Sequence, residues 1–276
     1  YSFLAREADE PLMNDLKLKT KTASRGRLIT LPHISPQLFR FLGMILSDGH
    51  LRKNYVEFHN SDYTLLNDFV CLGRNLFGLE AKIENYGYRT PRVRIYSQVI
   101  TKLLNIGFYV PYGNKAKIIR VPSLLFERND NCVREFLSGI IDCEGHINKV
   151  GLDIWMSSDL FIEDLAYLFN RLGIVVRKRK NRICITGWKN VKTLNENILL
   201  RKKDKVYNLR AILNRKIGRT ISNVDLIPNV SGLIRNVRVI ISCCKGNFQM
   251  VLVFREDSLV CGRMALEIRH FLHLIN

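Results

Sequence analysis

A short pattern that occurs twice constrains the fold of this chain more than any other feature. Residues 41–49 read Phe-Leu-Gly-Met-Ile-Leu-Ser-Asp-Gly, and residues 137–145 read Leu-Ser-Gly-Ile-Ile-Asp-Cys-Glu-Gly. In each copy an apolar helical segment ends in an acid followed by glycine, and the two acids, Asp48 and Glu144, lie 96 positions apart. Similarity at a fixed distance indicates a chain built from two equivalent units.

The first unit is expected to span residues 35–108. Ser35 suits a helix N-cap and Pro36 the first helical position, and the apolar residues that follow repeat at helical spacing. Gly49 is a suitable residue to end that helix. Residues 50–107 then predict strand, strand, helix, strand, strand, helix, because polar and apolar residues alternate in short segments on either side of a helix from Asp62 to Gly78.

The same order of elements recurs in a second unit, residues 131–200. It begins with a helix over 131–143, continues with a helix that opens at Ser157-Ser-Asp159, and ends with strands near 174–180 and 182–187. Residues 109–130 predict a linker, residues 1–34 an N-terminal lead-in, and residues 201–276 a C-terminal extension of unknown role. Four further elements are expected from residue 190 onward: a helix over 190–216, strands near 237–242 and 249–254, and a last helix over 262–274.

The balance of charge indicates the class of partner. Lys and Arg number 43 against 25 Asp and Glu, which gives a formal net charge of +18 spread along the chain. Such a field attracts polyanions, so we expect nucleic acid, with an anionic membrane surface or a generally basic proteome as the alternatives. No apolar run is long enough to span a bilayer, and no membrane partner is expected. Seven cysteines without a Cys-x-x-Cys pair favour a reduced, intracellular protein that is not secreted, in the cytoplasm, the nucleoid or an organelle.

The two repeated stretches resemble the LAGLIDADG motif, and a motif at the head of each of two similar units resembles the monomeric two-motif LAGLIDADG homing endonucleases. The resemblance covers roughly residues 35–200. It implies an α+β fold in which two pseudo-symmetric αββαββα units form a saddle of antiparallel sheets. It also implies that the motif helices pack along a pseudo-twofold axis through four small residues: Gly43, Ser47, Gly139 and Cys143.

The resemblance implies that Asp48 and Glu144 are catalytic metal ligands, and electrostatics points the same way. Two carboxylates at neighbouring helix ends repel each other unless a cation lies between them. Hard oxygen ligands suit Mg²⁺, with Mn²⁺ as a substitute, and phosphodiester hydrolysis then follows two-metal logic. Leu46 stands where the second copy has an earlier acid, Asp142, which is not the family's metal ligand.

Other catalytic groups are weaker candidates. His59 lies on a strand where related enzymes often carry a polar residue of the water network, which makes it a further catalytic candidate. For a basic group near the scissile phosphate the candidates are Lys53, Lys149, Arg94 and Lys180. Each of these is also a candidate for an ordinary backbone contact to DNA.

The strands are expected to carry sequence recognition. In the family, the sheets lie over the major groove of double-stranded DNA, and one face of each strand reaches bases and phosphates. Alternation nominates eleven DNA-binding residues: Glu57, His59, Arg92, Arg94, Tyr96, Asp153, Trp155, Arg177, Arg179, Arg182 and Thr186. Differences between the halves imply a non-palindromic target, and the family implies a long site, cleavage to 3′ overhangs and a monomeric enzyme.

Three alternatives stay open. The first is an RNA maturase that binds its host intron RNA, although both acids are intact, which favours the nuclease. The second is the endonuclease region of an intein, since residues 31–36 and 225–229 look similar to such regions. Tyr1 and the final Ile275-Asn276 do not fit splice junctions, so we expect a free-standing or intron-encoded enzyme. A catalytically silent transcription factor is the third, and it would be expected to have lost one acid.

Overall fold

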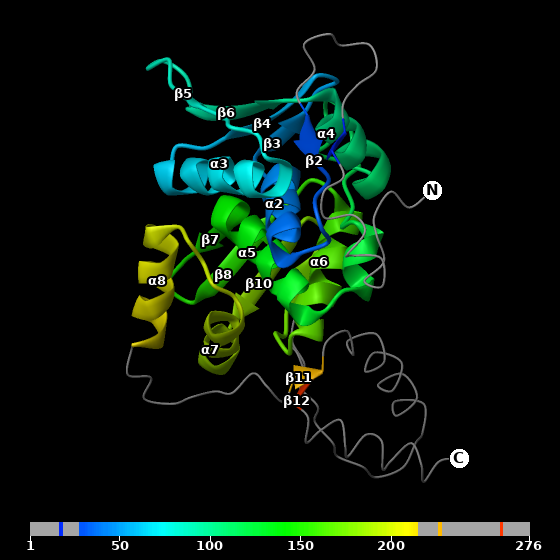
Figure 1. Ribbon diagram of the computed structural model, residues 1–276. Coiled ribbons are helices and arrows are strands. Elements are labelled where there is room, and N and C mark those ends of the chain that lie inside the picture. Colours follow the sequence, from blue (N-terminus) through cyan, green and yellow to red (C-terminus); the bar gives the residue numbers. More distant parts are fainter. Residues whose placement is uncertain (1–16, 19–27, 215–225, 228–259, 262–276) are drawn as a thin grey trace, which may run out of the picture.

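The computed structural model describes residues 17–18, 28–214, 226–227 and 260–261, and it divides residues 36–213 into two similar sets of elements (Figure 1). The first set follows the order helix, two strands, helix, two strands, helix. Its members are α2 (Pro36–Leu46), β3 (Gly49–Leu51), β4 (Tyr55–His59), α3 (Tyr63–Phe77), β5 (Ile83–Glu84), β6 (Arg92–Tyr96) and α4 (Gln98–Lys102), which continues as the π-helical turn η2 (Leu103–Gly107). This is the order predicted for residues 50–107.

The second set repeats that order after a short 3₁₀ helix, η3 (Ser123–Glu127), which lies in the segment expected to be a linker. Its members are α5 (Asp130–Glu144), β7 (Gly145–Ile147), β8 (Gly151–Trp155), α6 (Asp159–Arg171), β9 (Arg177–Arg179), β10 (Arg182–Thr186) and α7 (Trp188–Asn197), with α8 (Lys203–Leu213) after it. Two short antiparallel pairs join β1 (Lys17–Leu18) to β2 (Ile29–Thr30) and β11 (Leu226–Ile227) to β12 (Val260–Cys261).

The two four-stranded sheets have the same topology. Their strand orders are β3-β4-β6-β5 and β7-β8-β10-β9, and every pairing is antiparallel. In each sheet one face is apolar and buried, with Val56, Phe58, Val93 and Ile95 in the first. Because side chains alternate across a strand, the polar residues between them share the opposite face. The α+β fold of two pseudo-symmetric units is therefore confirmed.

Helix ends follow the expected chemistry, with one correction. Ser35 caps α2 by accepting from the Leu38 amide, Asp62 caps α3, and Gly78 ends α3 in the left-handed region at φ 68°. The prediction that Gly49 ends α2 was wrong, since α2 is capped by Ser47 and Gly49 opens β3. Position 49 requires glycine because the backbone there lies against α2: a Cβ on Gly49 would lie 2.5 Å from the Cα of Ile45.

The predicted helix over 190–216 is interrupted. Residues 198–202 separate α7 from α8, and Ile198 is extended. The backbone amides of Arg201 and Lys202 donate instead to the carboxylate of Asp142, at 3.1 Å. These two amides therefore donate to an acid on α5, and they do not continue the backbone hydrogen bonds of α7. The elements expected at 237–242, 249–254 and 262–274 fall outside the described residues.

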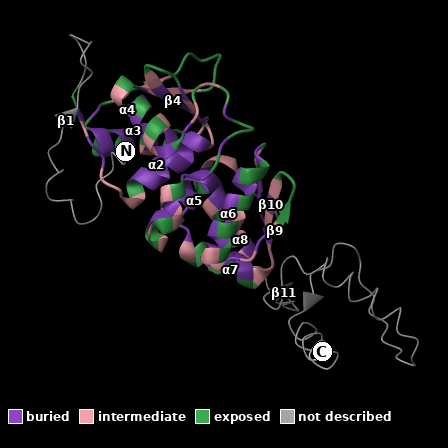
Figure 2. Ribbon diagram, turned by 90° about the vertical axis from the view of Figure 1, so that its right-hand side faces the viewer, coloured by how far each residue is buried: buried purple, intermediate pink, exposed green. Residues whose placement is uncertain are grey.

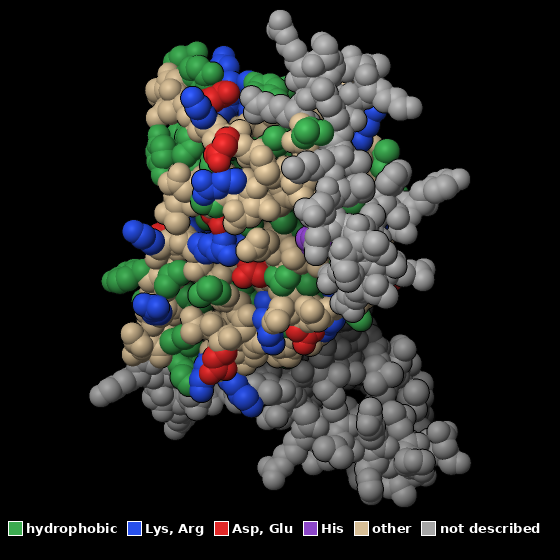
Figure 3. Space-filling view, viewed as in Figure 1, with side chains coloured by type: hydrophobic (Ala, Val, Ile, Leu, Met, Phe, Trp, Pro, Cys, Tyr) green, Lys and Arg blue, Asp and Glu red, His purple; other side chains and the backbone are tan. Residues whose placement is uncertain are grey.

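Helices α2 and α5 form the centre of the molecule. Figure 2 shows them side by side and buried along most of their length. On the surface, basic side chains lie beside acidic ones over the face drawn in Figure 3. Cys71, Cys132, Cys143 and Cys184 are free thiols, and no described helix has the length and apolarity to cross a membrane.

Candidate active site

The packing of α2 on α5 brings the two motif acids to one place. A Cβ on Gly43 would lie 2.5 Å from the carbonyl oxygen of Phe136, and one on Gly139 would lie 2.7 Å from that of Arg40. Only glycine permits this approach of two backbones. Asp48 follows the C-cap of α2 and Glu144 is the last residue of α5, so the two acids emerge at the same end of the helix pair.

The two carboxylates affect each other electrostatically. Burial raises the pKa of Glu144, and the negative charge of Asp48 raises it further. A like-charged pair of this kind favours a cation between its members. Asp48 and Glu144 therefore lie close enough to interact, as the paired motif predicts.

Two buried lysines hold the ends of the motif helices. Lys115 Nζ donates to the carbonyls of Ile45, Leu46 and Ser47, at 2.5, 2.6 and 2.7 Å. Lys205 Nζ donates to three carbonyls at the equivalent end of α5, which are those of Ile141, Asp142 and Cys143, at 2.7, 2.8 and 3.2 Å. These carbonyls lie at the ends of the helices, where few backbone amides are available to them, and only that of Ile141 also accepts from a cap amide, that of Gly145. Each lysine therefore fixes the backbone immediately before a motif acid.

The ammonium group of Lys115 also interacts electrostatically with both motif acids. Burial lowers the pKa of Lys115 to about 8, against the opposing effect of the Asp48 and Glu144 carboxylates. Burial also lowers the pKa of Lys205, and the neighbouring Lys202 lowers it further. Sequence reasoning missed both lysines, because they lie in the expected linker and the expected C-terminal extension. The named candidates Lys53, Lys149 and Lys180 are exposed.

A cavity of about 590 Å³ opens beside Asp48. The amide Nδ2 of Asn60 donates to Asp48 Oδ2 at 2.7 Å and orients the carboxylate. Four other side chains that line the cavity are His50, Glu57, His59 and Lys115. His59 Nε2 lies 3.5 Å from Glu57 Oε1, so the predicted water-network residue shares a cavity with Asp48. His50 Nε2 is buried and has no hydrogen-bond partner among residues 28–214.

The residues nominated in the first half lie together on the polar face of its sheet. Arg94 Nε donates to Glu57 Oε2 at 2.8 Å, directly across the strands. Arg92 Nε donates to Glu84 Oε2 at 2.8 Å, and the Tyr96 hydroxyl lies 3.5 Å from Arg94 NH1. These pairs fix long side chains in place on the face that the sequence predicts to meet DNA.

The second half carries a similar but not identical face. Asp153 binds Arg182 through two contacts, Oδ2 to NH2 at 2.7 Å and Oδ1 to Nε at 3.2 Å. Trp155 is 41% exposed and lies under the Arg182 guanidinium, with Cζ 4.6 Å from the ring centre. Arg177 pairs with Cys184 and Arg179 with Arg182 across the strands. Thr186 ends β10, opposite Gly151.

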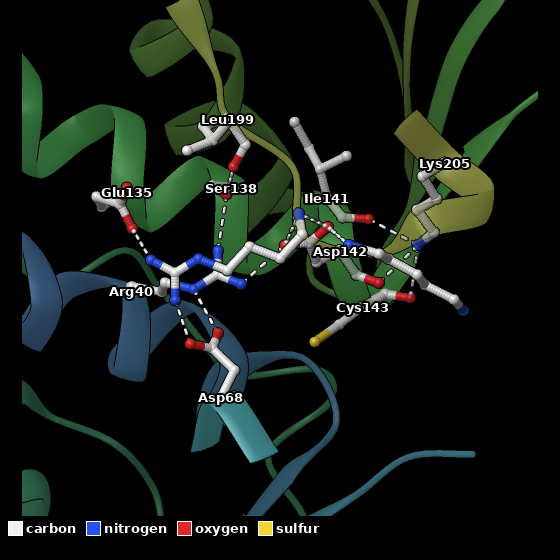
Figure 4. Close-up of polar contacts among 11 residues, drawn as sticks. Arg40, Asp68, Glu135, Ser138, Ile141, Asp142, Cys143, Leu199 and Lys205 are labelled. Carbon is white, nitrogen blue, oxygen red and sulfur yellow. Dashed lines mark hydrogen bonds and ion pairs between the residues drawn. The ribbon is translucent and has the colours of Figure 1, made fainter. Parts of the chain in front are cut away.

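An asymmetric network joins the two motif helices away from the acids (Figure 4). Arg40 is fully buried and donates to Asp68 at 2.6 Å, Ser138 at 2.7 Å and Asp142 at 2.8 Å. Arg201 adds ion pairs to Asp68 and Glu135. The earlier acid of the second motif is thus a structural anchor that neutralises Arg40.

The carboxylates of Asp48 and Glu144 fit a divalent metal whose other ligands are water and substrate phosphate. Within the described residues, no group of three or more His, Cys, Asp or Glu side chains could hold a metal unaided. Asp48 and Glu144 are hard oxygen donors, and Mg²⁺ usually keeps several waters and binds only one or two carboxylates together with substrate phosphate. The acid pair meets that requirement.

Part of the chain is similar to a known protein family. Residues 131–217 match the model of the LAGLIDADG-like domain. The glutamine–fructose-6-phosphate aminotransferase of Methanocaldococcus jannaschii is 27% identical over 206 residues, which are 70% of this chain and 19% of that protein. The replication factor C small subunit of the same organism is 30% identical over 240 residues, 81% of this chain and 12% of that protein. The chain thus spans about a fifth or less of these relatives.

Two solved structures are also similar. The crystal structure of I-DmoI in complex with DNA and Mn is 15% identical, with a TM-score of 0.43 over 66% of this chain and 98% of that one. The homing endonuclease I-WcaI bound to its DNA recognition sequence is 18% identical, with a TM-score of 0.42 over 64% of this chain and 87% of that one.

Proposed function

Since residues 131–217 match the LAGLIDADG-like domain, we propose that this chain is a LAGLIDADG protein and a site-specific double-strand DNA endonuclease, a homing endonuclease. It would hydrolyse phosphodiester bonds in a long, non-palindromic site and leave 3′ overhangs. The observation that carries the proposal is the packing of Gly43 and Gly139 at the helix crossing, which brings Asp48 and Glu144 together. One chain supplies both acids, so the enzyme acts as a monomer.

Asp48 and Glu144 would hold the metal, Mg²⁺ with Mn²⁺ as a substitute. When bound, such ions lower the pKa of an attacking water and stabilise the leaving 3′ oxygen. Asn60 orients the Asp48 carboxylate through its amide donor. Lys115 and Lys205 hold the two helix ends and add positive charge where a phosphate would enter. His59 faces the cavity beside Asp48 and would hold water there.

The polar faces of the two sheets would bind the target. Their arginines meet phosphates and base edges, and each phosphate contact releases counterions, so affinity should fall steeply with salt. The halves differ at equivalent positions, since Arg94 lies opposite Glu57 where Cys184 lies opposite Asp153. Such differences support a target whose two halves are not related by symmetry.

Sequencing of cut ends tests the proposal. The full chain is incubated with a randomised duplex DNA library, with and without Mg²⁺. We expect breaks with 3′ overhangs at one long site, and only when Mg²⁺ is present. Binding to structured intron RNA without any cutting of duplex DNA would contradict the endonuclease and favour an RNA maturase.

A second candidate concerns the protein that would contain this enzyme. The relatives carry unrelated names, an aminotransferase and a replication factor among them, and the matched segment is 12–19% of each. A segment common to unrelated proteins supports an endonuclease region inserted into host proteins, as in an intein. The test is the reading frame on both sides of the coding sequence. A host protein continuous with both ends supports the intein, whereas stop codons at both ends contradict it.

A further inference from the structure

Two carboxylates occupy equivalent, central positions on the faces that would bind DNA. Glu57 lies in the middle of β4 and Asp153 in the middle of β8, 96 positions later. They are only 7% and 3% exposed, although both lie on the polar side of their sheet. A carboxylate repels a polyanion, so its presence at the centre of a DNA-binding face calls for a role. Each holds an arginine, but the two arginines are held differently.

In the first half, Glu57 binds the guanidinium of Arg94 through a single nitrogen. Only Nε of Arg94 donates to the carboxylate, at 2.8 Å, while the Tyr55 ring supports the guanidinium with Cζ 4.9 Å from its centre. The outer nitrogens make weaker contacts: NH1 lies 3.5 Å from the Tyr96 hydroxyl and 3.8 Å from Glu84 Oε2. In the described residues, nothing binds NH2. The NH1 and NH2 end of the fork is thus oriented and available.

In the second half, Asp153 occupies most of the fork of Arg182. It binds both Nε and NH2, which leaves NH1 alone without a partner in the described residues. Asn148 Nδ2 donates to the same carboxylate at 2.7 Å and fixes it further. The position that corresponds to Arg94 is Cys184, which lies directly opposite Asp153. A thiol on one carbon has neither the reach nor the donors of an arginine.

Guanine presents two acceptors, O6 and N7, in the major groove, and an arginine recognises them with two parallel donors. Arg94 has such a pair of donors in place. Arg182 has only NH1 left to donate, which suits a single phosphate oxygen. We propose that Arg94 reads a guanine in one half of the target, that Glu57 positions it, and that the second half has no equivalent reader. This inference rests on the proposed function and names specificity-determining residues for it.

Selection of bound duplexes from a randomised library tests the inference. The wild-type chain should enrich one site with a strongly preferred guanine in one half. Arg94→Lys keeps the charge but loses the fork, so the preference for that guanine should fall about tenfold or more. The slope of affinity against salt should stay the same, because the charge is retained. Glu57→Ala should weaken the same preference by loosening Arg94.

Arg182→Lys is the matched control, since it makes the same chemical change on the other sheet. It should lower affinity for all sequences alike and leave the guanine preference intact. An Arg94→Lys variant that keeps the guanine preference, or an Arg182→Lys variant that loses a base preference of equal strength, would overturn the inference alone. A wild-type chain that enriches no sequence would overturn the proposed function as well. Preferences at the other positions of the site report that each variant is folded.

Discussion

Lys115 and Lys205 make the same set of contacts at the ends of the two motif helices. Each ammonium donates to three consecutive backbone carbonyls, and the residue that follows is Asp48 in one case and Glu144 in the other. The lysines lie 67 and 61 positions after those acids, in segments of different secondary structure. The pseudo-symmetry of the site thus extends to residues outside the repeated pattern.

Replacing Lys115 should weaken both the fold and catalysis. Lys115→Met leaves three buried carbonyls without their donor, so the free energy of unfolding should fall by about 2 kcal/mol or more. Cutting should fall as well, because the backbone before Asp48 loses its anchor. Lys117→Met is the control, since Lys117 is exposed two positions away. Urea unfolding curves that coincide for Lys115→Met and the wild type would contradict this role.

The depressed pKa of Lys115 predicts a pH-dependent stability. Its pKa is about 8 in the folded chain and 10.5 in the unfolded one. Between those values the unfolded chain binds more protons, so the unfolding free energy should rise with pH across that window and level off below pH 8. Lys115→Met should lose this rise. The measurement is the difference between the wild type and the variant at pH 8 and at pH 10.5, and an equal difference at both would count against the shifted lysine.

The Arg40 network should show strong coupling between the motif helices. Arg40→Met leaves Asp142 buried without its cationic partner, which should cost about 3–5 kcal/mol of unfolding free energy. The equivalent residues of the other half are Phe136 and Leu46, both buried and apolar. The double variant Arg40→Phe with Asp142→Leu should therefore lose much less than the sum of its single changes. A strictly additive double-mutant cycle would show that the pair is not coupled.

The helix crossing should tolerate no side chain. Gly43→Ala places a methyl group 2.5 Å from the carbonyl oxygen of Phe136, so the helices must separate. The melting temperature should fall. The rate of DNA cutting should also fall, and by more, because the distance between Asp48 and Glu144 depends on this contact. Gly107→Ala is the control, since its Cβ would lie at an ordinary 3.6 Å from Leu103 Cδ1. Equal effects of the two substitutions would contradict the crossing.

Local pattern was sufficient for most of the fold. The caps at Ser35 and Asp62 and the alternation over Arg92–Tyr96 depend on neighbours in the chain, so the elements and the faces of the strands followed from the sequence. The repeated motif located Asp48 and Glu144 because each acid lies at or just after the end of its motif helix.

Contacts between distant segments could not be predicted in this way. The break after α7 arises because Asp142, on α5, takes the amides of Arg201 and Lys202. Lys115 and Lys205 contact helix ends that are far from them in the sequence, so local pattern does not reveal these contacts. Gly49 was assigned to a helix cap because local pattern does not reveal how closely β3 approaches Ile45.

The most direct test of the paired active site is cutting of the selected DNA site by Asp48→Asn and by Glu144→Gln, each at fixed Mg²⁺. Glu196→Gln on the exposed side of α7 is the matched control for loss of one carboxylate. We predict that each of the first two substitutions abolishes double-strand cutting, that both variants still bind the site, and that the control cuts normally. Unchanged cutting by both Asp48→Asn and Glu144→Gln would contradict the shared centre.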